Sequence, residues 1–295
     1  MIRPVKFGFN AETAVNNAFQ MEMTDERTQE RALEEFDGFV QILRNNGLDV
    51  MVIDDDPLPH TPDSIFPNNW ISFHGNGFIC LYPMYAPNRR AERKADILEK
   101  IGKKFKVRNT LDLTHFEEEG LFLEGTGSMV LDRDNKLAYA CLSPRTDKKV
   151  LQAFCLRIGY RPMTFTAVDA NDQAIYHTNV MMCVADKYVV LCLDALPLEI
   201  ERNWLFNSIK KSNKEPVLIG LEQMTHFAGN MLQVHDRHNE KLLLMSSQAY
   251  ASLLPEQIAT LSAYNRIIHA PLTTIETNGG GSARCMIAEI HLPLR

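Results

Sequence analysis

The sequence lacks an excess of basic residues and a long apolar run. Its 295 residues include 31 Lys and Arg against 37 Asp and Glu, which gives a formal net charge of −6. Such a chain offers no basic face to a phosphate backbone, and no apolar run approaches the roughly 20 residues that span a bilayer. The opening MIRPVKFGFN has no long apolar core and no small-residue cleavage site, which disfavours a signal peptide. We therefore expect a cytoplasmic protein without nucleic-acid or membrane partners.

The sequence also lacks cysteines at the close spacing of metal-binding or redox motifs. The six cysteines form no CxxC pair, which disfavours a zinc knuckle or a thioredoxin-like site. The scattered histidines show no ligand spacing, so we predict no metal and no cofactor. Four cysteines lie within apolar runs and are predicted to be small core residues: Cys80, Cys141, Cys183 and Cys192. Cys285 differs, because three glycines and Arg284 precede it, and the apolar run after it predicts a strand.

No linker rich in Pro, Gly or Ser divides the chain, so we expect a single domain over residues 1–295. The sequence instead contains a weak fivefold repeat. Each repeat opens with a hydrophobic or small residue, continues with small and polar residues, and enters a β-rich apolar run. The five stretches are FPNNWISF from Phe66, FLEGTGSMVL from Phe122, IYHTNVMMCV from Ile175, FAGNMLQV from Phe227 and GGGSARCMIAEI from Gly279, with 52 to 56 residues between successive starts.

A turn and then a helix-like segment follow each of the first four stretches. Four stretches lead through turn residues into a second β-rich run, which predicts hairpins; the turns are Asn76-Gly77, Asp134-Asn135, Asp186-Lys187 and Asn239-Glu240. Helices are predicted over 25–47, 88–105, 146–159, 198–212 and 254–265, with a short strand after each. The unit is therefore ββαβ. Because so small a unit cannot bury its own apolar face, we expect five units to close into one α/β ring.

The mouth of this ring, defined as the starts of the five stretches, would bring together residues far apart in the sequence. It would gather Cys285, His177 and Glu124, with Asn230 at the matching place in the fourth stretch. A thiol, an imidazole and a carboxylate are the parts for covalent acyl or amidino transfer. The thiolate attacks a planar carbon, the histidine moves protons, and the carboxylate orients its partners.

Six motifs in order along most of the chain resemble those of the guanidino-group-modifying enzymes, the pentein superfamily of arginine deiminases, amidinotransferases and dimethylarginine dimethylaminohydrolases. They are DSIFPNNW with Asp63, APNRRAE with Arg89, LEGTG with Glu124, LSPRTD with Arg145, IYHTN with His177 and GGGSARC with Cys285. The resemblance implies a five-bladed, pseudo-fivefold α/β propeller built from ββαβ repeats, with the active site at its centre. That expectation agrees with the repeat counted from the sequence.

The resemblance also implies roles for these residues. Cys285 would attack the central carbon of a guanidinium or ureido group. His177 would protonate the leaving amine and then activate water. Arg89 and Arg145 would grip the carboxylate of an amino-acid substrate, and Asp63 would open the substrate loop.

Three asparagines stand where relatives that act on cationic guanidinium groups carry acids: Asn68, Asn69 and Asn179. A buried guanidinium requires carboxylate partners, whereas an amide offers a donor and an acceptor without charge, which suits a neutral ureido group. Together with the opening RPVKFGFNAETAVNNAFQ, these asparagines resemble the citrulline-utilising hydrolase branch. We expect hydrolysis of free citrulline to ornithine, carbon dioxide and ammonia through a covalent cysteine intermediate.

Several alternatives stay open from the sequence. The substrate could instead be arginine or a methylated arginine, and the group could pass to an amine, as in an amidinotransferase. The ribosome anti-association factors have this fold without the nucleophile, but the three catalytic residue types and the acidic charge disfavour that function. The oligomeric state, including a homo-oligomer, is left open.

Overall fold

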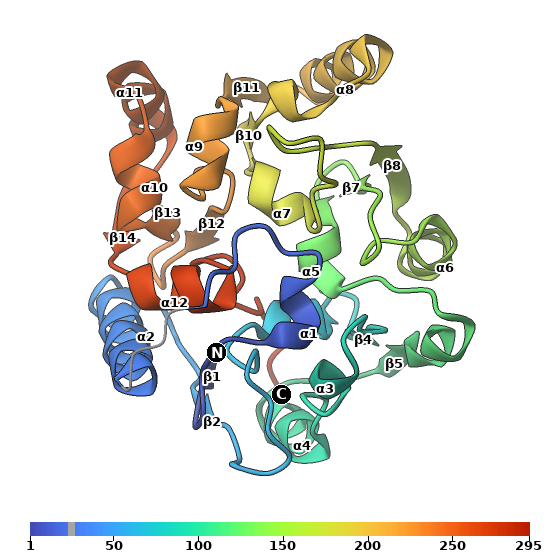
Figure 1. Cartoon of the computed structure of the whole chain (residues 1–295), viewed down its shortest axis with the longest axis vertical. Helices are drawn as coiled ribbons and strands as arrows, with labels where there is room; N and C mark the ends of the chain where they lie inside the picture. The colour runs from blue at the N-terminus through green and yellow to red at the C-terminus, as the bar shows by residue number, and fades with distance from the viewer. Residues whose placement is uncertain (23–26) are drawn as a thin grey trace.

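Five blades surround one axis in the computed structural model, which describes residues 1–22 and 27–295 (Figure 1). Four blades contain a three-stranded sheet. In each, the first two strands form an antiparallel hairpin and the third strand runs parallel to the second. The chain passes from one blade to the next around the ring, and the start of each hairpin faces the centre. The predicted fivefold α/β ring is therefore confirmed.

The strands are short and follow the repeat. Blade 1 contains β3 (Ile71–Phe73), β4 (Phe78–Leu81) and β5 (Asn109–Asp112); blade 2 contains β6 (Val130–Asp132), β7 (Leu137–Cys141) and β8 (Arg161–Phe165); blade 3 contains β9 (Met182–Val184), β10 (Tyr188–Leu191) and β11 (Glu215–Leu218); blade 4 contains β12 (Leu232–His235), β13 (Lys241–Ser246) and β14 (Arg266–Ala270); blade 5 contains β1 (Ile2–Arg3) and β2 (Ile53–Asp54). Each of the four predicted turns connects the two strands of a hairpin, as the turn residues indicated.

Helices connect the strands. The helices are α1 (Ala11–Ala14), α2 (Thr28–Asn45), α3 (Pro87–Arg90), α4 (Ala95–Lys104), α5 (Gly125–Ser128), α6 (Lys148–Ile158), α7 (Thr178–Met181), α8 (Glu199–Lys211), α9 (Leu221–Thr225), α10 (Ser247–Ser252), α11 (Pro255–Tyr264) and α12 (Thr273–Gly279), with 3-10 turns η1 (Pro67–Asn69), η2 (Thr114–Glu119) and η3 (Leu193–Ala195). The longer ones, α2, α4, α6, α8 and α11, lie on the outside of the ring, whereas the short α1, α5 and α7 lie nearer its centre (Figure 1). The helix predicted over 25–47 is α2, and its first two predicted residues lie outside the described residues. The helix predicted over 88–105 is split into α3 and α4, because the chain turns at residues 91–94, where the backbone N–H of Lys94 donates to the carbonyl of Glu92 at 2.9 Å instead of to the carbonyl four residues back.

One predicted element does not form. The apolar run after Cys285 was expected to be a strand, but the chain turns there instead, and residues 286–291 contain no strand. The N–H of Cys285 donates to the carbonyl of Ser282 at 2.9 Å, and the guanidinium of Arg284 donates to the carbonyl of Ile287 at 2.9 Å. These bonds occupy groups that a ladder would need, so the fifth sheet consists of β1 and β2 alone.

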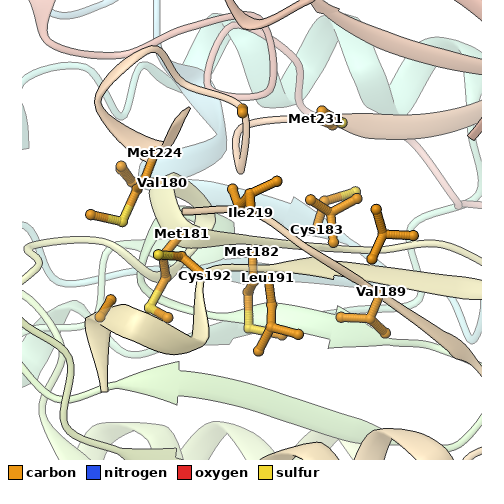
Figure 2. Packing of buried hydrophobic residues seen from close by; sticks show 14 of the residues in the cluster. Val180, Met181, Met182, Cys183, Val189, Leu191, Cys192, Ile219, Met224 and Met231 are labelled. Atoms are coloured by element: carbon orange, nitrogen blue, oxygen red, sulfur yellow. The ribbon is translucent and has the colours of Figure 1, made fainter. Parts of the chain in front are cut away.

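The blades are held together by buried apolar side chains. Between blades 3 and 4, methionine, valine, leucine and cysteine side chains pack against one another (Figure 2). Cys183 and Cys192 lie in this cluster, and Cys80 and Cys141 lie in the cores of blades 1 and 2. Burial raises the pKa of the Cys141 thiol to about 12, so it is an inert core residue. The predicted core role of these four cysteines is confirmed.

Among the described helices, none combines the length and the apolar character needed to cross a membrane. Within the same residues, no cluster of three His, Cys, Asp or Glu side chains is placed to hold a metal ion.

Candidate active site

The ends of the blades meet in a narrow pocket at the centre of the ring. It is lined by Thr13, Asn17, Asp63, Phe66, Asn69, Arg89, Arg145, Tyr176, His177, Gly279, Gly280, Gly281 and Cys285. These residues come from the N-terminal segment, from the hairpin starts of blades 1 and 3, from the segments after β4 and β7 that carry Arg89 and Arg145, and from the glycine-rich loop. Ring closure therefore gathers the thiol and the imidazole, as the repeat indicated, together with the two arginines that the family motifs indicated.

The glycine-rich loop brings Cys285 to the pocket with its side chain buried. Gly280 has φ +62°, a left-handed conformation that favours glycine. A Cβ on Gly280 would lie 2.4 Å from Nδ2 of Asn17, so a larger residue would also displace the N-terminal segment. Tyr176 fixes the loop from the other side, because its hydroxyl donates to the carbonyl of Gly280 at 2.5 Å. The glycines therefore allow the close approach that positions the thiol.

His177 and Glu124 form a buried pair. His177 Nε2 lies 2.7 Å from Glu124 Oε2, and the backbone N–H of Tyr85 donates to Glu124 Oε1 at 3.0 Å. Burial acts to raise the pKa of Glu124, but Arg145, His177 and Arg89 outweigh it and hold this pKa well below its usual range. Burial lowers the pKa of His177 to about 4, although Glu124 acts against that shift. An ionised carboxylate can only accept, so neutral His177 carries its proton on Nε2 and keeps the Nδ1 lone pair free to take a proton.

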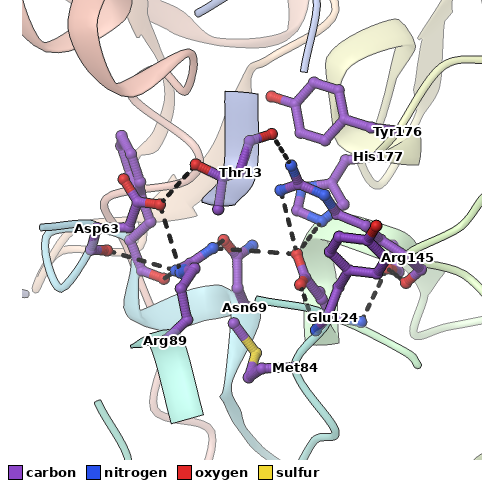
Figure 3. A network of polar contacts seen from close by, with 12 residues as sticks. Thr13, Asp63, Asn69, Met84, Arg89, Glu124, Arg145, Tyr176 and His177 are labelled. Carbon is purple, nitrogen blue, oxygen red and sulfur yellow. Dashed lines mark hydrogen bonds and ion pairs between the residues drawn. The ribbon is translucent and has the colours of Figure 1, made fainter. Parts of the chain in front are cut away.

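Arg145 lines the pocket and lies between the carboxylate of Glu124 and the N-terminal segment. Its Nη1 lies 3.5 Å from Glu124 Oε2, and its guanidinium stacks over the ring of Tyr176 at 4.9 Å (Figure 3). Nη2 donates to the carbonyl of Thr13 at 2.6 Å, and Nε and Nη2 both donate to Oδ1 of Asn16. The side-chain oxygen of Asn16 therefore occupies a position that one oxygen of a bound carboxylate could take.

Arg89 is more fully occupied. Its Nε and Nη2 donate to the two carboxylate oxygens of Glu92 at 2.8 and 3.0 Å, and its Nη1 donates to Oδ1 of Asn69 at 2.8 Å. Nη2 also lies 3.4 Å from the backbone carbonyls of Asp63 and Phe66. Most of its five N–H groups are thus used within the protein. Burial raises the pKa of Glu92 to about 7, against the attraction of Arg89.

Asp63 lines the pocket, and only one of its carboxylate oxygens accepts hydrogen bonds from the described residues. Its Oδ2 accepts from Asn10 Nδ2 at 2.7 Å and from Thr13 Oγ1 at 3.1 Å, and it lies 3.7 Å from Arg89 Nε. Its Oδ1 is buried and has no hydrogen-bond partner among the described residues. A buried acceptor of this kind is costly unless a ligand or water pairs with it.

The three asparagines occupy different positions. Asn69 lines the pocket, and Asn179 donates from Nδ2 to Cys285 Sγ at 3.3 Å. Asn68 lies behind Asn69, and its Oδ1 accepts from Asn69 Nδ2 at 3.1 Å. A direct role in binding substrate therefore has geometric support at Asn69 and Asn179, and Asn68 supports Asn69.

Several residues around the pocket received no role in the sequence analysis: Asn10, Thr13, Asn16, Glu92, Tyr176 and Asn230. Asn10, Thr13 and Asn16 lie in the N-terminal segment, whose polar sequence supported the resemblance without indicating contacts. The spacing of Arg89 and Glu92 is the i, i+3 spacing of paired charges on a helix, which could have suggested their ion pair. Tyr176 precedes the predicted histidine directly.

A family profile described as N,N dimethylarginine dimethylhydrolase, eukaryotic, matches residues 3–292. The chain belongs to this family. The predicted membership of the guanidino-group-modifying enzymes is thereby confirmed. As a member, the chain is a hydrolase that acts on carbon–nitrogen bonds, which confirms the predicted enzyme class. A search of curated proteins found no match.

Solved structures agree with this family and fold. The substrate-bound N-terminal domain of ArgZ, an arginine dihydrolase of the ornithine-ammonia cycle in cyanobacteria, is 19% identical with a TM-score of 0.76, over 99% of this chain and 98% of that one. AgrE in complex with L-arginine is 18% identical with a TM-score of 0.77, over all of this chain and 40% of that one. A dimethylarginine dimethylaminohydrolase adduct is 15% identical with a TM-score of 0.65, over 97% and 96%. The chain spans about 40% of full-length ArgZ, and at these identities the likeness establishes the shared fold.

Proposed function

We propose that the protein hydrolyses the ureido group of free citrulline to ornithine, carbon dioxide and ammonia through a covalent intermediate on Cys285. The observation that carries this choice of substrate is the orientation of Asn69. Its Oδ1 accepts from Nη1 of Arg89, a group that can only donate, so the oxygen and nitrogen of this amide are not interchangeable. One N–H of Nδ2 donates to Asn68 Oδ1, which leaves the second N–H free.

That second N–H is available to the substrate in the proposal, because Asn69 lines the pocket together with His177. The two side chains lie close to each other on either side of Gly127. A Cβ built on Gly127 would lie 2.4 Å from Asn69 Nδ2 and 2.8 Å from His177 Nδ1. An N–H donor there suits the carbonyl oxygen of a ureido group. It opposes the N–H groups of a guanidinium, which has no acceptor.

Asn179 completes the recognition of a neutral group. Its Nδ2 donates to Cys285 Sγ, and its Oδ1 is buried with no hydrogen-bond partner in residues 1–22 and 27–295. The oxygen can accept an N–H of the ureido group as the sulfur approaches the ureido carbon. Asn69 and Asn179 would then bind the acceptor and the donor of the same planar group.

Arginine is the second candidate substrate. The centre of the ring contains several buried carboxylates, although the asparagines in the sequence suggested that it would contain few. Asp63, Glu92 and Glu124 are all buried there. Each is already paired with an arginine, at 3.7 Å for Asp63 and 2.8 Å for Glu92 with Arg89, and 3.5 Å for Glu124 with Arg145. A substrate guanidinium would compete with Arg89 and Arg145 for these carboxylates. A buried charge that is incompletely paired costs several kcal/mol of free energy.

The amino-acid end of the substrate has two matching groups. Arg145 can donate two parallel N–H groups to a carboxylate once Asn16 releases them, and such bidentate pairs are strong and directional. The free Oδ1 of Asp63 can accept from the α-ammonium group. Arg89, whose donors are mostly engaged, is assigned instead to positioning Asn69 and the loop of Asp63.

The reaction then follows from the residues in place. Neutral His177 takes the thiol proton of Cys285, and the sulfur bonds to the ureido carbon. The bond from that carbon to the terminal nitrogen breaks, and ammonia leaves with the proton from His177. Water, deprotonated by His177, attacks the thiocarbamate and releases the thiolate, and the carbamate of ornithine loses carbon dioxide.

The proposal predicts that citrulline releases ammonia faster than arginine at equal concentration. Asn69→Asp should shift the preference toward arginine, because a carboxylate there attracts a guanidinium and repels a ureido oxygen. The measurement is ammonia and ornithine formed from each substrate, with and without an acceptor amine, which also separates hydrolysis from transfer. A wild-type preference for arginine of tenfold or more, roughly 1.4 kcal/mol in transition-state binding, would refute the ureido assignment and leave the Cys285 chemistry intact.

Arg145→Lys should raise the KM for citrulline by about tenfold with a smaller change in kcat, because a lysine cannot form the bidentate pair. Agmatine, which lacks the α-carboxylate, should be a poor substrate of the unaltered protein. Steady-state kinetics of both proteins on citrulline test the first statement. Agmatine turnover comparable to that of the amino acids would contradict the second.

A further inference from the structure

We propose that Asn230 is a further residue of the reaction centre, which stabilises Cys285 as a thiolate by donating a hydrogen bond to its sulfur. The inference rests on the proposed use of Cys285 as the nucleophile. The family motifs that indicated the other site residues do not include Asn230.

The position of the Asn230 side chain is fixed on every side. It is fully buried just before β12, and its Oδ1 accepts the backbone N–H of Arg284 at 3.0 Å. Because a backbone N–H can only donate, the nitrogen of the amide must face the other way. There Nδ2 lies 2.9 Å from the carbonyl oxygen of Asn179 and 3.3 Å from Cys285 Sγ. One N–H serves each acceptor, and the amide has no freedom to turn.

Two side-chain amides from different blades thus converge on the sulfur. Asn179 comes from α7, at the start of blade 3, and Asn230 from the start of blade 4, and each Nδ2 lies 3.3 Å from Sγ. A hydrogen bond to an ionised acceptor is about twice as strong as one to a neutral acceptor. Both amides therefore favour the thiolate over the thiol.

Neither Arg284 nor His177 is arranged to do this instead. Arg284, the adjacent residue, donates to the carbonyl of Ile287 at 2.9 Å and to Glu289 at 3.2 Å. Burial lowers the pKa of His177 to about 4, so its imidazole is neutral near pH 7. Within the described residues, the hydrogen bonds to Sγ come from the two amides. Neutral donors suit a site that must also accept a neutral substrate.

The test replaces the donor in two ways. Asn230→Asp keeps the shape and an oxygen that can accept from Arg284, but it removes the N–H that faces Sγ and adds a negative charge there. Asn230→Ala removes the N–H without adding charge, so it decides the contribution of the hydrogen bond. The readout is the rate at which iodoacetamide alkylates Cys285 as a function of pH, without substrate, followed by mass spectrometry of the Cys285 peptide. In that reaction the thiolate sulfur bonds to the methylene carbon and iodide leaves. The midpoint of the profile should move up by about one pH unit or more, a tenfold fall in thiolate fraction below the midpoint.

Asn230→Ala should move the midpoint in the same direction without the contribution of an added charge. Asn265→Ala is the matched control, because Asn265 is another buried amide that bonds to the Tyr188 hydroxyl and the Leu261 carbonyl and does not contact the sulfur. Its profile and turnover should equal those of the unaltered protein. If folded Asn230 variants keep the original midpoint, the proposal is overturned. Since no substrate is used, a wrong substrate assignment leaves this result unaffected.

Discussion

Replacement of Cys285 by serine is expected to lower citrulline turnover by roughly a thousandfold or more, while the thermal unfolding midpoint stays close to that of the unaltered protein. A serine hydroxyl at neutral pH is a far weaker nucleophile than a thiolate, and loss of a nucleophile removes the covalent route entirely. The change exchanges one small buried group for another, and two amides remain to hydrogen-bond with it. Ammonia release and a melting curve on the same preparation are the measurements.

A second cysteine provides the control for this substitution. Cys155 is buried in α6, within the core of blade 2, and does not line the pocket. Cys155→Ser should retain turnover even if its melting temperature falls, because a buried hydroxyl there has a packing cost but no chemical role. Near-normal activity of Cys285→Ser would remove the nucleophile from the account.

The second large effect is expected at Gly127. A Cβ added to this residue would lie 2.4 Å from Asn69 Nδ2 and 2.8 Å from His177 Nδ1, distances that require both side chains to move. Because a displacement of about 1 Å in a reacting group can cost a hundredfold in rate, Gly127→Ala should lower turnover by about that factor. The measurement is kcat on citrulline, supported by a melting curve to verify that the variant is folded.

Gly102 offers a matched comparison, because a Cβ there meets no atom within 4 Å and the residue lies within α4. Gly102→Ala should leave turnover unchanged, since it adds the same methyl group away from the site. Retention of more than half the activity by Gly127→Ala would mean that the pocket is less tightly packed than these distances imply.

Local sequence predicted the repeating parts of this fold well, because hairpin turns and amphipathic helices depend on neighbouring residues. Asn76-Gly77 lies between β3 and β4, and the helix predicted over 198–212 is α8. The strand predicted after Cys285 was wrong for the opposite reason. Its apolar residues satisfy the strand pattern, but the turn that includes Ser282 and Arg284 depends on contacts that the pattern does not contain.

The sequence indicated which residues lie in the site, but it did not indicate which side chains they would hydrogen-bond with. The motifs indicated Arg89 and Arg145 as equivalent carboxylate grips, yet folding gives Arg89 the carboxylate of Glu92 and the amide of Asn69 as partners. Whether an arginine is free or occupied depends on which side chains surround it after the ring closes. Asn230 is a similar case: its place in the repeat was visible, but its contact with Cys285 joins residues 55 positions apart.

The charge of the pocket shows the same limit. Asparagines in the sequence suggested few counter-charges at the reacting end. The folded centre nevertheless contains Asp63, Glu92 and Glu124, which are matched by buried Arg89 and Arg145. Preference for a neutral substrate therefore depends on the orientation of individual amides, above all Asn69, rather than on a lack of charge.

The central claim, a covalent attack by Cys285 on the ureido carbon of citrulline, is tested most directly by the mass of the enzyme quenched in acid during turnover. The expected result is a species heavier by the mass of citrulline less ammonia, with the addition on the Cys285 peptide and absent from Cys285→Ser. An unmodified Cys285 peptide throughout rapid citrulline turnover, or the same addition in the serine variant, would contradict the account.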